Sequence, residues 1–436
     1  MELGTPEQTL SPTPRRRRTW LRVVAAVVLG VVLVTSGFIG GLAAGQSTVP
    51  TVPAGQEPTS AKPVFNVFWQ AWTLVQQHYV DRAAVNPTTM TDGAISGMLN
   101  SLGDVGHTRF LTPADVKAEQ QSLQGQLEGI GAEIGIHNGQ PTIIAPIPGA
   151  PAQKAGVRAG DVLVRVDGKP VTGLSLDQIV AEVRGPAGTS VTLTVIHPGQ
   201  STFTDITIVR QTITVPSVSW AILPGTTVAH ILITSFSTNT TKDLQTAIKA
   251  AQAAGAQSIV LDLRNNPGGY VSEAIGVASQ FIANGNVFIQ RNAAGKETPN
   301  AVTGNGVAYD IPMVVLVNNG TASAAEIVAG ALQDHQRAKI VGETTFGTGT
   351  VLNQFPLSDG SAILLGTEEW LTPNGHQIWH KGITPNVSVT LPANAEPLIP
   401  DQEHGMTAAQ LRSSQDTQLL RALQLLGQPA TATPTP

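Results

Sequence analysis

The chain has 436 residues, of which 13% are charged and 41% hydrophobic, with 44 glycines, 30 prolines and no cysteine. This length suggests two or three domains, and the low charged fraction excludes a coiled coil or a highly charged disordered chain. Without cysteine there is no disulfide, zinc-thiolate site or thiol nucleophile. A formal net charge of −5 argues against nucleic acid as a partner.

The N-terminal region places four arginines, residues 15–18, ahead of an uncharged run from Val23 to Ala44. As a helix, this run of 22 residues is long enough to cross a hydrocarbon layer of about 30 Å. Basic flanks stay cytoplasmic, so we expect a single-pass cell-membrane protein with a cytoplasmic N-terminus and an extracytoplasmic remainder. A cleaved signal peptide is the alternative, because Ala43-Ala44-Gly45 resembles a small-residue cleavage site.

Residues 46–63 are rich in proline and poor in large apolar residues, which is typical of a spacer. Apolar residues at helical intervals then predict a helix from Val64, and a second helix follows with Thr91 as its N-cap. Thr112 and Pro113 suit the N-cap and first position of a third helix. Just before this third helix lies the sequence GDVGHT, which contains His107.

Between residues 120 and 212 short β-rich runs alternate with turn signals such as Asp167-Gly168, and Ser175 is expected to cap one helix. The stretch PGAPAQKAGVRAGDVLVRVDG and its continuation resemble a PDZ domain of bacterial exported proteases, which adds a peptide strand to an open sheet edge. By that resemblance, a C-terminal carboxylate meets backbone N–H groups of the turn around Gly129, Ile130 and Gly131. The alternative is a small β-domain that only packs against its neighbour.

From Thr226 to about Thr390 continuous apolar runs alternate with helical patterns, as in a parallel sheet covered on both faces. Two turns, NNPGG and NGTAS, follow such runs at the strand ends where α/β sites usually lie. Ser323 begins a helix there, and helix-start N–H groups, that of Ala324 above all, can hold an oxyanion. Gly268 and Gly269 lack a Cβ, so a peptide carbonyl can approach their N–H groups. The alternative is that Thr321 or Ser323 only caps the helix.

Together, DLRNNPGG and NNGTASAAEIVAGALQDHQRAKIVGE resemble the carboxyl-terminal processing proteases, a family of serine endopeptidases, over roughly residues 64–389. The resemblance implies Ser323 as nucleophile and Gly269 and Ala324 as the oxyanion hole, without a cofactor; Asp334 matches a family acidic position. It also implies cleavage of proteins or peptides with free C-termini, guided by the PDZ domain.

The expected fold class is an α/β peptidase core with an inserted β-rich PDZ domain, an N-terminal helical segment and one transmembrane helix. Its expected parts are a cytoplasmic tail (1–22), the transmembrane helix (23–44), a linker (45–63), the N-terminal helical part of the peptidase (64–119), the PDZ domain (120–212), the peptidase core (213–392) and a C-terminal helix with a disordered tail (393–436).

One departure from the family pattern concerns the general base. In the family this base is a lysine in a TFGKG motif, followed four residues later by glutamine, whereas TTFGTGTVLNQF has Thr348 and Leu352 at these positions. A threonine hydroxyl cannot accept a proton near neutral pH, so Ser323 lacks the usual base. Related tricorn-like peptidases use a histidine from the segment before the PDZ domain, and GDVGHT is similar to that segment.

We therefore expect His107 to deprotonate Ser323, because free imidazole titrates near pH 6.5. A structural role for His107 is the alternative, and His376 or His380 could replace it or line the substrate groove. A histidine base needs a carboxylate to fix its tautomer. A hairpin turn at residues 358–361 predicts Glu369 beside Thr350 in this role, and a one-residue slip would favour Glu368.

A function of a different class stays open: an inactive relative that binds peptides as a scaffold. The loss of the lysine favours it, whereas Ser323, the NPGG turn and GHT favour an enzyme. No HExxH motif occurs, and histidines and carboxylates do not cluster at metal-ligand spacing, so no metal site is expected.

Overall fold

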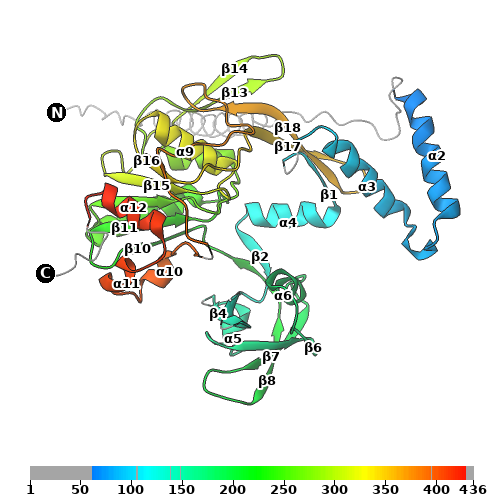
Figure 1. The fold of residues 1–436 in the computed structure, drawn as a ribbon, viewed down its shortest axis with the longest axis horizontal. Helices are drawn as coiled ribbons and strands as arrows, with labels where there is room; N and C mark the ends of the chain where they lie inside the picture. Colours follow the sequence, from blue (N-terminus) through cyan, green and yellow to red (C-terminus); the bar gives the residue numbers. More distant parts are fainter. Residues whose placement is uncertain (1–60, 105–106, 138, 148, 394, 429–436) are drawn as a thin grey trace, which may run out of the picture. The chain divides into compact units, whose positions relative to one another are not determined.

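The structure is a computed structural model that describes residues 61–104, 107–137, 139–147, 149–393 and 395–428 (Figure 1). Within these ranges, none of the helices combines the length and apolar content that crossing a bilayer requires. The run Val23–Ala44 lies outside the described residues. On this finding the predicted fold class is corrected to an α/β core with a PDZ domain. The predicted transmembrane helix, the membrane as a partner and the single-pass cell-membrane location are not supported.

The chain divides into two compact units, residues up to Leu74 and residues from Val75 onward. Helix α2 (Lys62–His78) begins in the first unit. The second unit starts with a 3-10 turn (Arg82–Ala84), α3 (Pro87–Asn100), β1 (Arg109–Leu111) and α4 (Pro113–Leu123). Asn86, not Thr91, caps α3, and Pro87 takes the first helical position, where its missing N–H costs nothing. The predicted start of α4 is confirmed, because Thr112 and Asp115 form a capping box.

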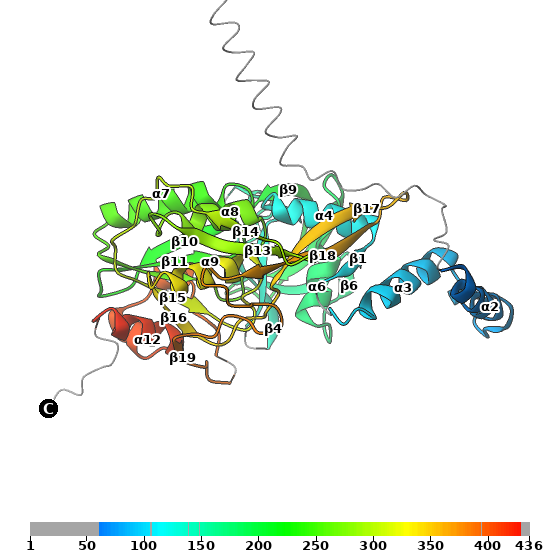
Figure 2. The ribbon, with the colours of Figure 1, turned by 90° about the horizontal axis from the view of Figure 1, so that it is seen from above.

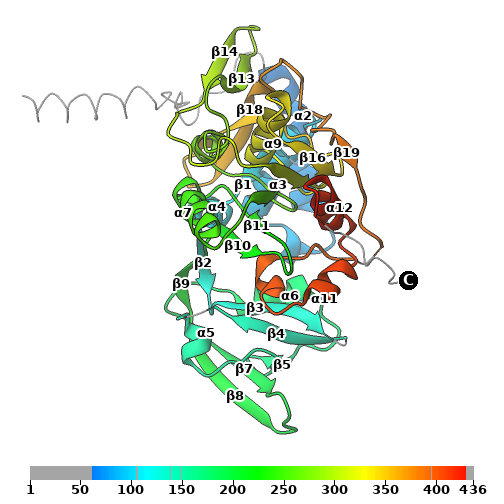
Figure 3. The ribbon, with the colours of Figure 1, turned by 90° about the vertical axis from the view of Figure 1, so that its left-hand side faces the viewer.

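The β-rich part is a sheet in the order β3-β4-β5-β7-β8, with β6 paired to β5 (Figure 3). A separate two-stranded ribbon pairs β2 with β9. Ser175 caps α6 as predicted, and Asp167 and Gly168 both take positive φ in a tight turn. The elements are β2 (Gln126–Gly129), β3 (Ala132–His137), β4 (Gln140–Pro146), α5 (Pro151–Lys154), β5 (Val162–Val166), β6 (Lys169–Pro170), α6 (Leu176–Val183), β7 (Ser190–Ile196), β8 (Phe203–Val209) and β9 (Gln211–Thr214).

The α/β core is a six-stranded sheet in the order β10-β11-β12-β15-β16-β19, parallel except for β10. Helices α7, α8 and α9 lie on one side of this sheet and α12 on the other (Figure 2). In β12, Ile259 and Leu261 face the first group while Val260 faces the second. The strands are β10 (Val218–Ile222), β11 (Val228–Ile233), β12 (Ser258–Asp262), β15 (Met313–Val317), β16 (Lys339–Gly342) and β19 (Val387–Ser388), and the helices are α7 (Thr240–Ala253), α8 (Val271–Ala278) and α9 (Ala324–Asp334).

The C-terminal segment forms three short helices, α10 (Pro400–Glu403), α11 (Ala408–Arg412) and α12 (Thr417–Leu425). The single C-terminal helix expected within residues 393–436 is thus divided, and Asp416 accepts from the Leu419 N–H to cap the start of α12. Leu411, Leu419 and Leu423 from this segment complete the core on the second side of the sheet.

A second, antiparallel sheet carries the predicted hairpin. Its strands are β1, β13 (Asn286–Asn292), β14 (Glu297–Ala301), β17 (Thr350–Pro356) and β18 (Ala362–Leu371). The predicted pairing of Thr350 with Glu369 is confirmed, and a bulge after Val351 shifts the register so that Leu352 faces Gly366. The bulge breaks the two-residue alternation on which the sequence argument relied.

Candidate active site

Ser323 stands directly before α9, where the buried strand β15 has passed through a short turn. Its φ of +56° is rare for a residue with a Cβ, so the surrounding structure holds it in place. Thr321 has a structural role in the same turn: its hydroxyl donates to the Leu263 carbonyl at 2.8 Å and accepts from the Asn318 N–H at 3.0 Å. The turn between β15 and α9 is therefore tied to the end of β12.

Glu326, fully buried in the first turn of α9, fixes both Ser323 and the segment that lacks the family lysine. One carboxylate oxygen accepts from the N–H groups of Ser323 and Thr348, each at 2.9 Å. The other accepts from the Thr345 hydroxyl at 2.5 Å and the Gly347 N–H at 2.7 Å. Burial raises the pKa of Glu326 above its usual value, and these four donors oppose that effect.

The glycine turn after β12 lies against Ser323. A Cβ on Gly268 would come within 2.6 Å of the Ser323 Cβ and 2.9 Å of the Ala324 nitrogen, so only glycine permits this approach. The Gly268 N–H donates to Asn266. Among the described residues, the N–H groups of Gly269 and Ala324 have no hydrogen-bond acceptor. Two such N–H groups are what an oxyanion hole requires.

His107 is buried, and its Nδ1 bonds to Oδ1 of Asp104 at 2.9 Å. Its Nε2 is buried without a hydrogen-bond partner among the described residues. Burial alone would raise the pKa of Asp104, but hydrogen bonds from Thr108, His107 and Trp379 outweigh it and keep that pKa below its usual value. A carboxylate on Nδ1 and a free Nε2 are the arrangement that a histidine base requires.

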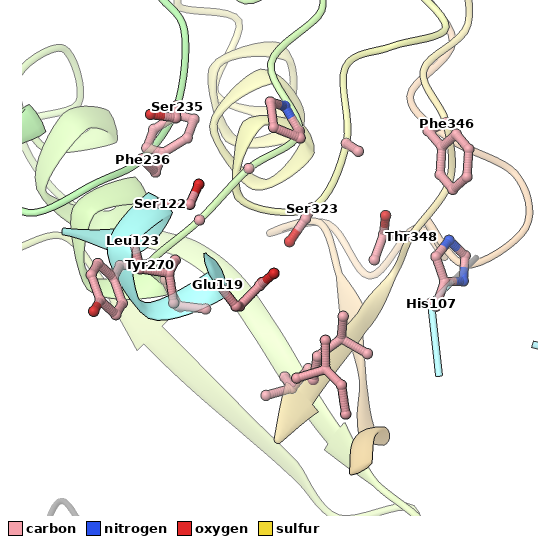
Figure 4. A pocket seen from close by; sticks show the side chains of 18 of the residues that line it. His107, Glu119, Ser122, Leu123, Ser235, Phe236, Tyr270, Ser323, Phe346 and Thr348 are labelled. Carbon is pink, nitrogen blue, oxygen red and sulfur yellow. The ribbon is translucent and has the colours of Figure 1, made fainter. Parts of the chain in front are cut away.

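Ser323 and His107 line one cavity of about 670 Å³ together with the glycine turn, Thr348 and the Phe346 ring (Figure 4). Figure 4 shows Thr348 between Ser323 and His107, and the Phe346 ring packs edge-on against the imidazole. No hydrogen bond joins His107 Nε2 to the Ser323 hydroxyl. Ser323 and His107 therefore line the same cavity without a direct hydrogen bond between their side chains.

The sequence of this chain is similar to the sequences of known proteases. A sequence profile described as Peptidase family S41 matches residues 227–389, and one described as PDZ domain matches residues 142–196. The chain is 38% identical over 363 residues to the carboxyl-terminal-processing protease of Synechocystis sp., covering 82% of this chain and 81% of the relative. It is 37% identical over 335 residues to the carboxy-terminal processing protease CtpA of Bacillus subtilis, covering 76% and 70%. The chain belongs to the carboxyl-terminal processing protease family.

Membership confirms the resemblance found in the sequence: the chain is a serine-type peptidase with a PDZ domain, and its substrates are proteins or peptides. A crystal structure of an S41 protease from Bacteroides fragilis has a TM-score of 0.52 at 16% identity, covering 82% of this chain and 97% of that one. This second likeness is one of fold alone.

Glu369 lies beside Thr350 as predicted but is not bonded to His107. One of its oxygens contacts Arg291 at 3.3 Å, and the other is buried without a partner among the described residues. The carboxylate on His107 belongs instead to Asp104, which the sequence argument missed. Its signal was available, because Asp104 precedes His107 by three residues in GDVGHT.

The other two predicted histidines lie outside this cavity. His376 is largely exposed and lies 3.4 Å from Asp334, whose carboxylate also accepts from the Asn374 N–H. His380 stacks on Trp379, and its ring centroid is 6.1 Å from that of His107. Neither histidine lines the cavity that holds Ser323.

The expected carboxylate-binding turn of the PDZ domain lies between β2 and β3. Gly129 ends β2, Ile130 is buried, and Gly131 has a φ of +73° and packs against Ala150. β3 is the terminal strand of its sheet and pairs only with β4 among the described strands. The turn therefore leads directly into an open sheet edge.

Proposed function

We propose that this serine peptidase cleaves proteins or peptides near their C-termini with Ser323 as nucleophile, His107 as general base and Asp104 as the carboxylate that orients His107. The single observation that carries the proposal is that one cavity is lined by Ser323, by Gly269 and by a histidine whose Nδ1 is bonded to a buried carboxylate. The N–H groups of Gly269 and of Ala324, the residue after Ser323, have no acceptor among the described residues. This is the set of groups that acyl transfer needs.

The proposed reaction has two stages. In the first, the Ser323 hydroxyl attacks the scissile carbonyl carbon while its proton passes to Nε2 of His107. The Gly269 and Ala324 N–H groups hold the oxyanion, and His107 then protonates the leaving amine. In the second stage, water hydrolyses the acyl-enzyme by the same proton path, which restores both residues.

Catalytic hydrogen bonds are often long or poorly aligned before substrate binds and tighten in the complex with substrate. We propose that a bound peptide closes the gap between His107 and Ser323. Thr348 and the Phe346 ring, which line the cavity beside them, are the groups that such closure would have to rearrange. The missing hydrogen bond is also the one observation that favours the second candidate function, an inactive peptide-binding scaffold.

We propose that the PDZ domain selects the substrate by its free C-terminus. An extended peptide would add to the edge of β3, and the N–H groups around Gly129, Ile130 and Gly131 would meet its carboxylate. The edge position of β3 supports this proposal, since a strand paired on both sides could not accept a peptide.

The experiment compares wild type, Ser323→Ala, His107→Gln and His376→Gln on a flexible peptide with a free C-terminus and on its C-terminal amide. We expect the Ser323 and His107 variants to lose at least about 100-fold in kcat, as general-base loss does. The amide should be cut more slowly by the wild type, and a fluorophosphonate should label only proteins that retain Ser323 and His107.

His376→Gln is the matched control, because it removes an exposed histidine outside the cavity and should keep wild-type rates. Full activity of His107→Gln would reject the histidine mechanism. No labelling and no hydrolysis by the wild type, with peptide binding intact, would favour the scaffold.

A further inference from the structure

Asp104 is held from two separate parts of the chain. Its Oδ2 accepts from the Thr108 hydroxyl at 2.7 Å and the Thr108 N–H at 3.2 Å, both on its own segment. Its Oδ1, the oxygen that binds His107, also accepts from the indole N–H of Trp379 at 3.1 Å. Trp379 lies 275 residues further along the chain, so this contact depends on tertiary structure alone.

Trp379 is seated on the segment where the family lysine is replaced. A Cβ on Gly349 would overlap the Trp379 backbone, so glycine is required for the two segments to pack. The His380 N–H donates to the Gly347 carbonyl at 2.9 Å, and the Ile383 N–H donates to the Thr345 hydroxyl at 2.7 Å. The same residues 345–348 are bound by Glu326 at the start of α9. A continuous set of contacts therefore leads from Ser323 to the Trp379 indole.

We propose that Trp379 is a positioning residue for the His107 base, acting through the Oδ1 atom of Asp104 that both of them bind; this inference rests on the proposed function. Two donors on one oxygen fix where that oxygen lies and hence where the imidazole points. The indole N–H also withdraws electron density from Oδ1, which weakens the hold of Asp104 on the imidazolium. Trp379 thus sets both the direction and the basicity of the base.

Removal of the indole N–H should act on kcat and on the pH profile together. Without it, His107 is the only side-chain donor on Oδ1 among the described residues. The carboxylate then stabilises the imidazolium more strongly, and the acidic limb of kcat/KM moves to higher pH. A loosened imidazole lowers kcat, whereas KM should change little because Trp379 does not line the cavity.

Other ionisable groups near His107 must be separated from this effect. The ring centroid of His380, on the Trp379 segment, lies 6.1 Å from that of His107. Arg109 and Glu119 line the same cavity and pair with each other at 3.0 Å. From β18, a Cβ placed on Gly366 would lie 3.4 Å from Oδ2 of Asp104 and 3.2 Å from the uncharged Thr350 hydroxyl of β17.

The test uses the full chain with Trp379→Phe, which keeps an aromatic ring and removes the N–H. We expect kcat to fall about tenfold with KM within about twofold. The midpoint of the acidic limb should rise. The low-field proton resonance of His107 Nδ1, identified by its loss in His107→Gln, should shift as well, and this readout does not depend on activity.

His380→Phe is the matched control. It keeps a ring stacked on Trp379 and removes the nearby imidazole, so rate, midpoint and resonance should stay at wild-type values. An unshifted midpoint and resonance in Trp379→Phe, or equal shifts in His380→Phe, would overturn the assignment of Trp379 while leaving the histidine mechanism standing. An active His107→Gln would instead reject the proposed function itself.

Discussion

The two halves of the cavity that holds Ser323 and His107 are built in different ways. On the Ser323 side, one buried carboxylate, that of Glu326, accepts four hydrogen bonds and ties the helix start to residues 345–348. On the His107 side, the imidazole is bonded to Asp104, which in turn is held by Thr108 and by the distant Trp379. The proposed nucleophile is thus set by local helix geometry, whereas the proposed base is assembled from segments far apart in the sequence.

This difference explains how the site can lose the family lysine. Glu326 binds the Thr348 backbone, not its side chain, so the segment keeps its position whatever residue 348 is. The proton acceptor can then come from another segment without changes at Ser323 or in the glycine turn. We expect variants of the Ser323 half to damage the fold and the activity together, and variants of the His107 half to damage activity more than the fold.

The largest effect is expected for Glu326→Gln. In the wild type each carboxylate oxygen of Glu326 accepts from two donors. In either orientation of the glutamine amide, its NH₂ group therefore faces two hydrogen-bond donors. In a fully buried site this mismatch should cost about 2–4 kcal/mol of unfolding free energy. We expect no detectable hydrolysis and a lower Tm, measured by peptide assay and thermal unfolding.

Glu273→Gln is its control, since Glu273 also accepts several hydrogen bonds, from Asn239 and Thr241, at the start of α7. That variant should lower Tm but keep fluorophosphonate labelling of Ser323. If Glu326→Gln unfolds like the wild type, the account of a rigid nucleophile half is wrong.

A smaller effect on stability, with a loss of activity, is expected for Asp104→Asn, because each oxygen of this buried carboxylate also bonds to two donors. An amide can bind His107 Nδ1 with its nitrogen only if the imidazole carries its proton on Nε2, which disables the base. We expect kcat to fall about 10²- to 10³-fold, with Ser323 and its oxyanion donors still in place. Steady-state kinetics and thermal unfolding measure the two parts of this prediction.

Asp115→Asn serves as the comparison, because it alters an exposed carboxylate that caps α4. It should cost about 1 kcal/mol of stability at most and leave kcat unchanged. Equal rates for Asp104→Asn and wild type would mean that His107 needs no carboxylate.

The parts of the site that were predictable from sequence are those fixed by local patterns. Strand, glycine turn and helix start put Gly268 next to Ser323 and Ala324, and a hairpin signal paired Thr350 with Glu369. Glu369 was predicted to bind His107 but contacts Arg291 instead. The alternation of side chains along a strand indicates which face of the sheet a residue lies on, but not which segment packs against that face. The bulge after Val351 also changes that face.

The Asp104–Trp379 contact illustrates what local patterns omit. It joins residues from opposite ends of the described chain through the packing of Gly349 against Trp379. No periodicity or spacing encodes such a contact, so only the three-dimensional structure shows it. The same holds for the C-terminal segment, where a capping aspartate, Asp416, also binds the buried Arg264.

A buried cluster around His230 allows the pH dependence of stability to be distinguished from the pH dependence of activity. On the side of the sheet that carries the C-terminal helices, the fully buried His230 bonds to Glu403 at 2.7 Å and to Asp262 at 3.1 Å. Burial opposes its charge, but the two carboxylates prevail and raise the pKa of His230 from 6.5 to about 9. Asp262 is in turn bound by Arg264, directly before the glycine turn.

An effect on stability without an effect on activity is therefore expected for His230→Gln. Because the folded-state pKa is raised, the stabilisation is complete below about pH 6.5 and is lost as pH rises toward about 9, roughly 3 kcal/mol in total. Wild-type unfolding free energy should fall over this range, and the fall should flatten in His230→Gln while the acidic limb of kcat/KM stays in place. His376→Gln, which alters an exposed histidine, should keep the wild-type slope. If the kinetic limb moved with His230, the pH dependence of activity would originate behind the sheet, and the division between a rigid nucleophile half and a tunable base half would fail.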